Sequence, residues 1–214
     1  MALLGSIGYG EPSPVLQSER LILRMPTMAD HVGWANLREQ SYSFLKQWEP
    51  TWPADDLTRA AFRRRLRRYM REVRNDTGYP FFLFRRDNGE VVGGLTLSNV
   101  RRGVTQSCSM GYWIGAPHAR QGYMSEAVER AVPFAFSRLG LHRVEAACLP
   151  HNEASITLLR RAGFSHEGLA RAYLRIDGQW RDHLLFARLA DDPEPAHRTH
   201  DRREVSLEGV KHNL

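Results

Sequence analysis

A glycine- and arginine-containing segment in the middle of the chain has the residue types of a phosphate site. A run of apolar residues ends at Ile114, a short loop follows, and an amphipathic helix begins near Gly122. The first N–H groups of a helix have no partner within the helix, and the helix dipole places partial positive charge there. The segment therefore predicts an anion site of the kind that a pyrophosphate requires. It contains neither a Walker loop nor the Gly-x-Gly-x-x-Gly pattern of dinucleotide folds.

A second segment, one predicted strand later, adds weight to the first. Asn152 is a good N-cap for a helix over 152–161, Ser155 lies on the first turn of that helix, and Gly163 is a typical left-handed stop. Capping explains Asn152 and Gly163, but it does not explain why such a helix follows the glycine loop so closely.

The elements that position these segments follow from periodicity and turn signals. Asn88-Gly89 lies between two apolar runs and predicts a hairpin. The expected strands are 20–24, 81–84, 91–97, 107–114, 143–148, 169–176 and 180–189. The expected helices run from Thr27 or Asp30 through Leu37, then over 55–74, 122–138 and 152–161. Strands that precede a helix–strand alternation indicate an α+β fold with a mixed sheet.

The bulk composition is that of one globular domain. The chain has 214 residues, of which 42% are hydrophobic and 25% charged. Cys108 and Cys148 fall within predicted strands and are expected to be buried hydrophobes. The start of the sequence does not resemble a signal peptide or a membrane span, so we expect a cytoplasmic protein without membrane contact.

The charge balance favours an acidic partner. The formal net charge is +6 and the pI is about 9.7, which fits RNA, a ribosomal surface or the phosphates of a nucleotide. Much of the charge lies on the predicted helix over 55–74, whose apolar residues recur at helical spacing. Its basic face is either a solvated surface or a weak RNA or ribosome contact through residues 59–74.

The sequence resembles the GNAT N-acetyltransferases, and within them the acetyltransferases of ribosomal-protein N-terminal alanine and serine. Residues 120–127 are similar to the pyrophosphate loop of that family, and 152–155 with 162–164 are similar to its later CoA-binding helix. Residues 173–183 resemble the terminal hairpin of the enzymes that acetylate an N-terminal alanine.

The resemblance implies a mixed, mostly antiparallel sheet of roughly six or seven strands, splayed between the fourth and fifth strands and flanked by about four helices. Composition and local pattern indicate a domain over residues 18–190, with a flexible leader at 1–17 and a poorly ordered charged tail at 191–214. The resemblance covers about this same domain. It also implies acetyl-CoA as cosubstrate and no metal. The residues that would bind acetyl-CoA are Tyr112, Trp113, Ile114, Gly115, Ala116, Ala119, Arg120, Gln121, Gly122, Tyr123, Met124, Asn152, Ser155 and Leu158.

The implied reaction is direct attack of a neutral amine on the thioester. A backbone N–H at a strand bulge near Trp113 or Ile114 would stabilise the oxyanion. Many relatives carry a tyrosine acid where this chain has Leu159, so Ser155 is the candidate that assists the thiolate. Glu145 is a candidate base, with a structural salt bridge to Arg143 or a neighbour as the alternative.

Further candidate residues lie near the predicted acceptor side. Asp177, Asp182 and His183 are other candidate bases, with turn and edge-strand roles as their alternatives. Trp48, Glu49 and Asp177 are the candidate substrate-binding residues.

The acceptor has three interpretations. The first is the N-terminal amine of a protein, with a ribosomal protein as target by resemblance. The second is a small amine such as a polyamine or an aminoglycoside, which the basic charge disfavours. The third is a CoA-binding module that acts on RNA or a ribosome through the basic helix. We expect a monomer or a homodimer.

Overall fold

The computed structural model describes residues 13–195, which form a single eight-stranded sheet with helices on both faces. The strand order is β1-β2-β3-β4-β5-β6-β8-β7, and every neighbouring pair is antiparallel except β5 with β6. The strands are β1 Leu16–Gln17, β2 Leu21–Arg24, β3 Gly78–Arg85, β4 Val91–Arg101, β5 Ser107–Ile114, β6 Arg143–Cys148, β7 Ser165–Ile176 and β8 Gln179–Leu189.

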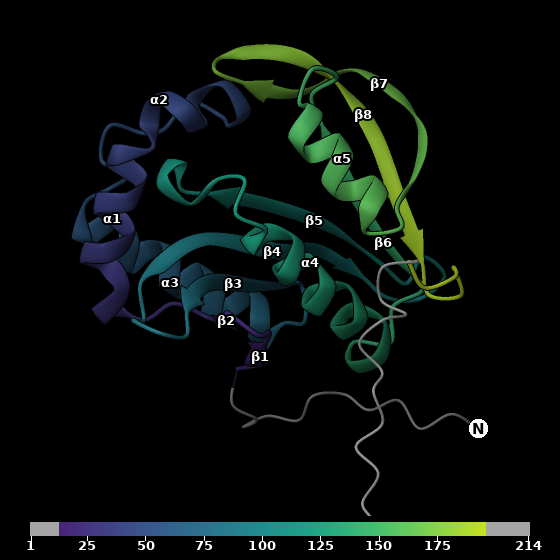
Figure 1. Ribbon diagram of the computed structural model, residues 1–214, viewed down its shortest axis with the longest axis horizontal. Coiled ribbons are helices and arrows are strands. Elements are labelled where there is room, and N and C mark those ends of the chain that lie inside the picture. The colour runs from purple at the N-terminus through teal and green to yellow at the C-terminus, as the bar shows by residue number, and fades with distance from the viewer. Residues whose placement is uncertain (1–12, 196–214) are drawn as a thin grey trace, which may run out of the picture.

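Helices cover both faces of this sheet, with α4 and α5 on the near face in Figure 1 and α3 behind it. The helical elements are η1 Met28–Asp30, α1 His31–Gln40, α2 Tyr42–Leu45, η2 Lys46–Trp48, α3 Arg59–Arg74, η3 Ala116–His118, α4 Tyr123–Pro133, the π-helical η4 Phe134–Arg138 and α5 Glu153–Arg161. One core lies under α4 and α5, and a smaller core lies between the sheet and helices α1 and α3.

Strand β3 is buried on both sides, which explains its unbroken apolar sequence. Phe81 and Leu83 point into the larger core, while Phe82 and Phe84 point into the smaller one. A strand with helices on both faces has no solvent-facing side, so alternation of polar and apolar residues disappears. The hydrophobic run therefore indicates that helices cover both faces of the sheet at β3.

The predicted fold class is confirmed, with differences in detail that include an additional short helix, α2. The sheet has eight strands because Leu16–Gln17 pairs with β2, inside the segment predicted as a leader. Helix α3 begins at Arg59 rather than at Asp55 because Thr58 is its N-cap, accepting the Ala61 N–H at 3.2 Å. Residues 1–12 and 196–214, which hold most of the predicted leader and tail, lie outside the described residues.

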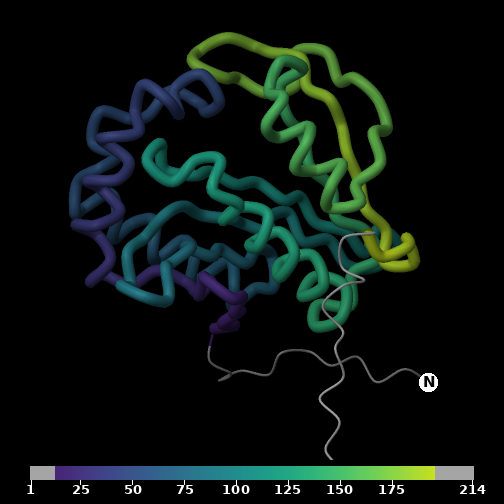
Figure 2. The backbone as a smooth tube through the Cα atoms, in the orientation of Figure 1, coloured from purple at the N-terminus to yellow at the C-terminus, as the bar shows by residue number. Residues whose placement is uncertain are grey.

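The sheet divides at its one parallel pair, as predicted. Strands β5 and β6 are paired only from Ser107 with Arg143 to Ser109 with Glu145. Beyond Ser109, β5 remains paired with β4 as far as Ile114, and β6 remains paired with β8 as far as Cys148. This is the predicted splay between the fourth and fifth strands, and the additional strand β1 shifts their labels to β5 and β6. The backbone traces in Figure 2 separate in this region.

Both cysteines are buried and free, as predicted. Within residues 13–195, no helix has the length and apolar character needed to cross a bilayer.

Candidate active site

The edge of β5 beyond Ser109 presents backbone groups to the open side of the splay. The Gly115 N–H donates to the Val92 carbonyl at 2.8 Å, and antiparallel pairing alternates direction at each residue. The backbone groups of Trp113 therefore face β4, and those of Tyr112 and Ile114 face the gap. Because the pairing with β4 is continuous from Gly111 to Ile114, the expected bulge is absent from this stretch. Ile114, rather than Trp113, offers an N–H to the gap.

The loop after β5 combines unpaired N–H groups with a helix N-terminus. Arg120 has a φ of 60° and Gly122, the N-cap of α4, has a φ of 84°. Within residues 13–195, the N–H groups of residues 120–125 have no hydrogen-bond partner. Several N–H donors beside the positive end of a helix match an anionic pyrophosphate. The predicted loop residues therefore fit the phosphate part of acetyl-CoA.

The C-terminal end of helix α1 and the residues just before strand β2 hold this loop in place. Gly115 packs so closely on Leu37 that a Cβ atom there would overlap the leucine side chain. The Ala116 N–H donates to the hydroxyl of the fully buried Ser41 at 2.9 Å.

On the other side of the loop, Arg20 is bound to two of its residues. Its guanidinium forms an ion pair with Glu126 in the first turn of α4 and donates to the Gln121 carbonyl at 3.0 Å. Ser18 donates to the same Glu126 carboxylate at 2.8 Å. The loop is thus pre-organised by residues from two other parts of the chain.

Ser155 and Tyr112 approach each other from α5 and β5. The Asn152 side chain caps α5 by accepting the Ser155 N–H at 3.1 Å, which fixes Ser155 on the first turn. Burial raises the pKa of Tyr112, and the neighbouring Ser155 hydroxyl partly opposes that rise. Two neutral hydroxyl groups therefore lie together at the splay. This contact was not expected from the sequence.

The other predicted residues of α4 and α5 are packing residues in this structure. Met124 and Leu158 are half-buried against the larger core. Leu159 is completely buried.

Glu145 lies at the closed end of the splay, where β5 and β6 are still paired. Its two carboxylate oxygens accept from Arg101 and Arg143, each at 3.0 Å. Arg143 is also paired with Glu167. These contacts support the alternative of a structural ion pair and give the predicted role as base no geometric support.

The predicted substrate residues lie together over the open end of the splay. The Asp177 N–H, at the tip of the β7–β8 hairpin, donates to the Glu49 carbonyl at 2.9 Å. The Trp48 ring lies 5.4 Å from the ring of His151, just before α5. We call Trp48, Glu49, His151 and Asp177 the acceptor arch. Figures 1 and 2 show the hairpin tip close to α2 and η2.

The remaining candidate bases are engaged locally in β8. The Asp182 carboxylate accepts the Ala172 N–H at 2.8 Å. His183 is buried, and its Nδ1 atom lies 3.0 Å from the Arg181 carbonyl oxygen.

Arg38 is a site residue that the sequence did not reveal. It lies on α1 with 6% of its surface exposed. Both terminal nitrogens contact the Glu49 carboxylate at 2.7 Å, and its guanidinium carbon lies 4.0 Å from the Trp52 ring centre and 4.8 Å from that of Trp113. The side chain thus connects the acceptor arch to the strand edge. An arginine among polar residues of α1 carries no sequence signal for this role.

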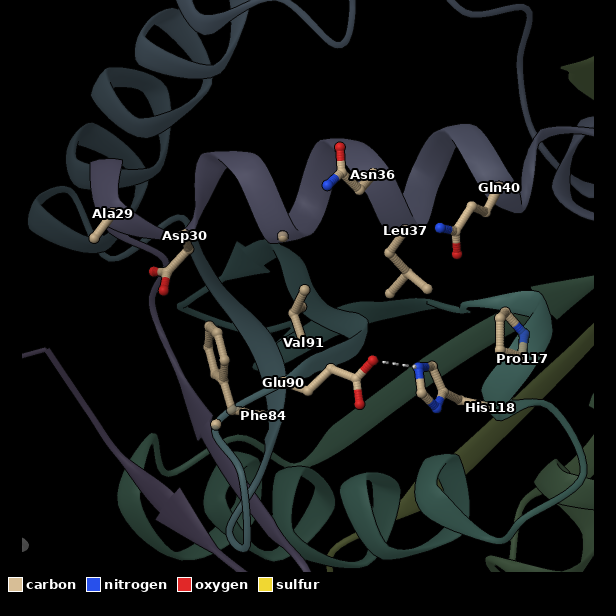
Figure 3. A pocket seen from close by; sticks show the side chains of 12 residues that line it. Ala29, Asp30, Asn36, Leu37, Gln40, Phe84, Glu90, Val91, Pro117 and His118 are labelled. Atoms are coloured by element: carbon tan, nitrogen blue, oxygen red, sulfur yellow. Dashed lines mark ion pairs between the residues drawn. The ribbon is translucent and has the colours of Figure 1, made fainter.

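A separate pocket of about 480 Å³ lies between α1, the β3–β4 turn and η3 (Figure 3). Glu90 and His118 face each other across it at 3.6 Å. Its lining includes Pro117 and His118 but none of residues 119–124 and none of the strand edge at 112–114. This pocket is therefore distinct from the predicted cofactor cleft. Residues 13–195 contain no cluster of three metal-ligating side chains.

Comparison with known proteins assigns this arrangement to a family. The acetyltransferase (GNAT) domain family matches residues 20–165. The chain is 35% identical to the ribosomal protein uS5-alanine N-acetyltransferase of Escherichia coli, over 86% of this chain and 95% of the relative. It is 32% identical to the probable N-acetyltransferase YjcK of Bacillus subtilis, over 84% and 99%.

Solved structures give the same result. The chain is similar to the ribosomal-protein-S5-alanine acetyltransferase of Vibrio fischeri, with a TM-score of 0.79, 28% identity and coverage of 86% of this chain and 100% of that one. It is similar to Mycobacterium smegmatis RimJ in complex with CoA-disulfide, with a TM-score of 0.79, 32% identity and coverage of 86% and 91%. The splayed sheet, the phosphate loop and these matches together show that the chain belongs to the GNAT acetyltransferase family.

Proposed function

We propose that this protein transfers an acetyl group from acetyl-CoA to the N-terminal α-amine of a ribosomal protein, with an N-terminal alanine as the preferred acceptor. The observation that carries the proposal is the match to the uS5-alanine N-acetyltransferase of Escherichia coli across 95% of that enzyme, which includes the hairpin that forms the acceptor arch. A ribosomal acceptor places the reaction in the cytoplasm.

The chain's own groups supply binding and charge stabilisation. The N–H groups of residues 120–125 bind the pyrophosphate, and the β5 edge at Tyr112 and Ile114 binds the pantetheine arm. Acetyl-CoA supplies the activated thioester. The Ile114 N–H donates to the carbonyl oxygen as negative charge develops there. Ser155 donates a hydrogen bond to the departing sulfur, and Tyr112 holds the Ser155 hydroxyl.

The amine requires little help with deprotonation. The reference pKa of an α-amino group is about 7.7–8.0, against about 10.4 for lysine. A useful fraction is therefore neutral near pH 7, and a weak base or water suffices. This agrees with the engagement of both candidate carboxylates on the strands, because Glu145 is ion-paired with Arg101 and Arg143 and Asp182 accepts the Ala172 N–H.

The acceptor arch argues against a small polyamine as acceptor. Both of its carboxylates already have basic partners, because Glu49 binds Arg38 and Asp177 lies 3.7 Å from Lys46. A polycation would need several uncompensated carboxylates.

Release of free thiol from acetyl-CoA tests the proposal. An alanine-initiated ribosomal peptide should support turnover, whereas spermidine and the same peptide with a blocked N-terminus should not. Equal turnover with spermidine would refute the choice of acceptor, and no turnover on any amine would refute the activity.

A further inference from the structure

Helix α3 carries two rows of arginine, of which only one forms ion pairs with carboxylates. The free row is Arg59, Arg63, Arg67 and Arg71, spaced four residues apart, and all four are exposed. The paired row is Arg64 and Arg68. Arg64 forms an ion pair with Asp55, and Arg68 lies 3.4 Å from Glu72. Within residues 13–195, no carboxylate forms an ion pair with any arginine of the free row.

The stability of the helix does not explain the free row. Phe62, Leu66 and Tyr69 anchor α3 to the sheet from its buried side. Like charges four residues apart on a helix repel each other. Arg59, the first residue of the helix, also opposes the positive end of the helix dipole. The row therefore weakens the isolated helix, which points to a role in binding.

The spacing of the row fits a repeating anion. Residues four apart are separated by about 6 Å along a helix, so the four guanidinium groups follow a line about 18 Å long. Guanidinium binds phosphate through two parallel hydrogen bonds. A nucleic acid strand presents such a regular line of phosphates, whereas a single bound anion would use one or two of these side chains.

We propose that the free row of α3 binds the phosphate backbone of RNA. The choice of RNA over DNA rests on the proposed function, because a ribosomal acceptor is surrounded by RNA. In the chain, the segment between Glu49 and Arg59 connects α3 to the acceptor arch. The contact would hold the enzyme near its acceptor without contributing to chemistry.

Two variants with the same change in net charge test this surface in the full chain. R63Q/R67Q removes two free arginines, and R64Q/R68Q removes two paired ones. Binding of a short fluorescein-labelled RNA hairpin is measured by anisotropy over a range of salt concentrations. Each phosphate contact adds about 0.7–0.9 to the slope of log affinity against log salt. R63Q/R67Q should lower that slope by about 1.5 and weaken binding about tenfold, while R64Q/R68Q should bind as the unmodified chain does.

Equal weakening by both variants would show an effect of net charge alone and would overturn the proposal. Absence of RNA binding by the unmodified chain, or stronger binding to a DNA duplex or to anionic lipid vesicles, would also overturn it. Acetylation of the free alanine-initiated peptide should be unchanged in both variants. A loss of RNA binding can therefore be distinguished from a loss of acetyltransferase activity. Thermal melting verifies that both variants are folded.

Discussion

Arg38, which is buried, and Glu49, which is half-buried, form an ion pair with two contacts of 2.7 Å, and this pair joins helix α1 to the acceptor arch. Trp52 donates to the same carboxylate at 2.7 Å. Glu49 is therefore a structural partner of Arg38, and its carboxylate is not free to attract a substrate ammonium. The pair positions the loop whose backbone carbonyl binds the hairpin at Asp177.

Replacing Glu49 tests this role. Glu49→Gln leaves the guanidinium of Arg38 buried without a counter-charge, which should cost about 3 kcal/mol of unfolding free energy. The KM for peptide should rise more than the KM for acetyl-CoA, because the acceptor arch loosens. Glu39→Gln, which changes an exposed residue next to Arg38 on α1, is the control. A Glu49→Gln variant with unchanged melting temperature and peptide KM would show that the pair is dispensable.

Gly94 leaves space for the Trp113 indole on the neighbouring strand. A Cβ atom on Gly94 would lie 2.5 Å from Trp113 Nε1, whereas one on Gly111 would have no heavy atom within 4 Å. Gly94→Ala should therefore cost about 1–3 kcal/mol by overpacking and displace the indole from Arg38. Gly111→Ala is the matched control and should be close to neutral. Chemical denaturation of both variants provides the measurement, and equal stabilities would contradict the packing argument.

Ser155→Ala should slow turnover without weakening CoA binding to the same degree. Loss of a donor to the departing sulfur should lower kcat about tenfold to a hundredfold, while the Kd for CoA changes less than about twofold. Thr157→Ala, exposed on the same helix, should leave both quantities unchanged. Equal losses in kcat and in CoA affinity would remove the assigned role.

Tyr112→Phe tests whether the two hydroxyl groups act as a unit. If Tyr112 acts by holding the Ser155 hydroxyl, the double variant Tyr112→Phe/Ser155→Ala should be no slower than Ser155→Ala alone. Additive effects of the two changes on kcat would show that the groups act independently.

Buried acids should make the fold sensitive to alkaline pH. Burial raises the pKa of Cys108 to about 12 and that of Cys148 to about 11, and it raises the pKa of Tyr112 as well. In the unfolded chain these groups ionise near about 8.5 for cysteine and about 10 for tyrosine. Because folding holds the protons more tightly, the stabilisation is complete below those values and is lost as pH rises above them.

Melting temperatures measured from neutral to alkaline pH check this expectation. The melting temperature should fall from about pH 8.5 upward, and the fall should begin at higher pH in Cys108→Ala/Cys148→Ala. An identical pH dependence in that variant would contradict the assignment to the thiols.

Local patterns predicted most of the elements, but not the contacts between them. The Asn88-Gly89 turn, the Asn152 cap and the periodicity of α3 were sufficient to place their strands and helices because the responsible forces act over a few residues. Strand β1 was missed because a pairing of two residues, Leu16 and Gln17, has no pattern of its own.

The site residues stay a prediction, and the sequence could indicate only those features of the site that depend on the local backbone. The loop after Ile114 was identified because glycine and a helix start are visible in sequence. Arg38 and the Tyr112–Ser155 contact were not, because each joins elements distant in the chain. Glu145 was placed on the correct strand, yet its engagement by Arg101 depends on a register between β4, β5 and β6 that sequence does not show.

Locating the acetyl group on a product peptide tests the central claim most directly. An alanine-initiated peptide from ribosomal protein uS5 with its lysines intact is incubated with the protein and acetyl-CoA, and the product is fragmented in a mass spectrometer. The account predicts one acetyl group, on the α-nitrogen of the N-terminal alanine. Acetylation of a lysine side chain, or an unmodified peptide, would contradict it.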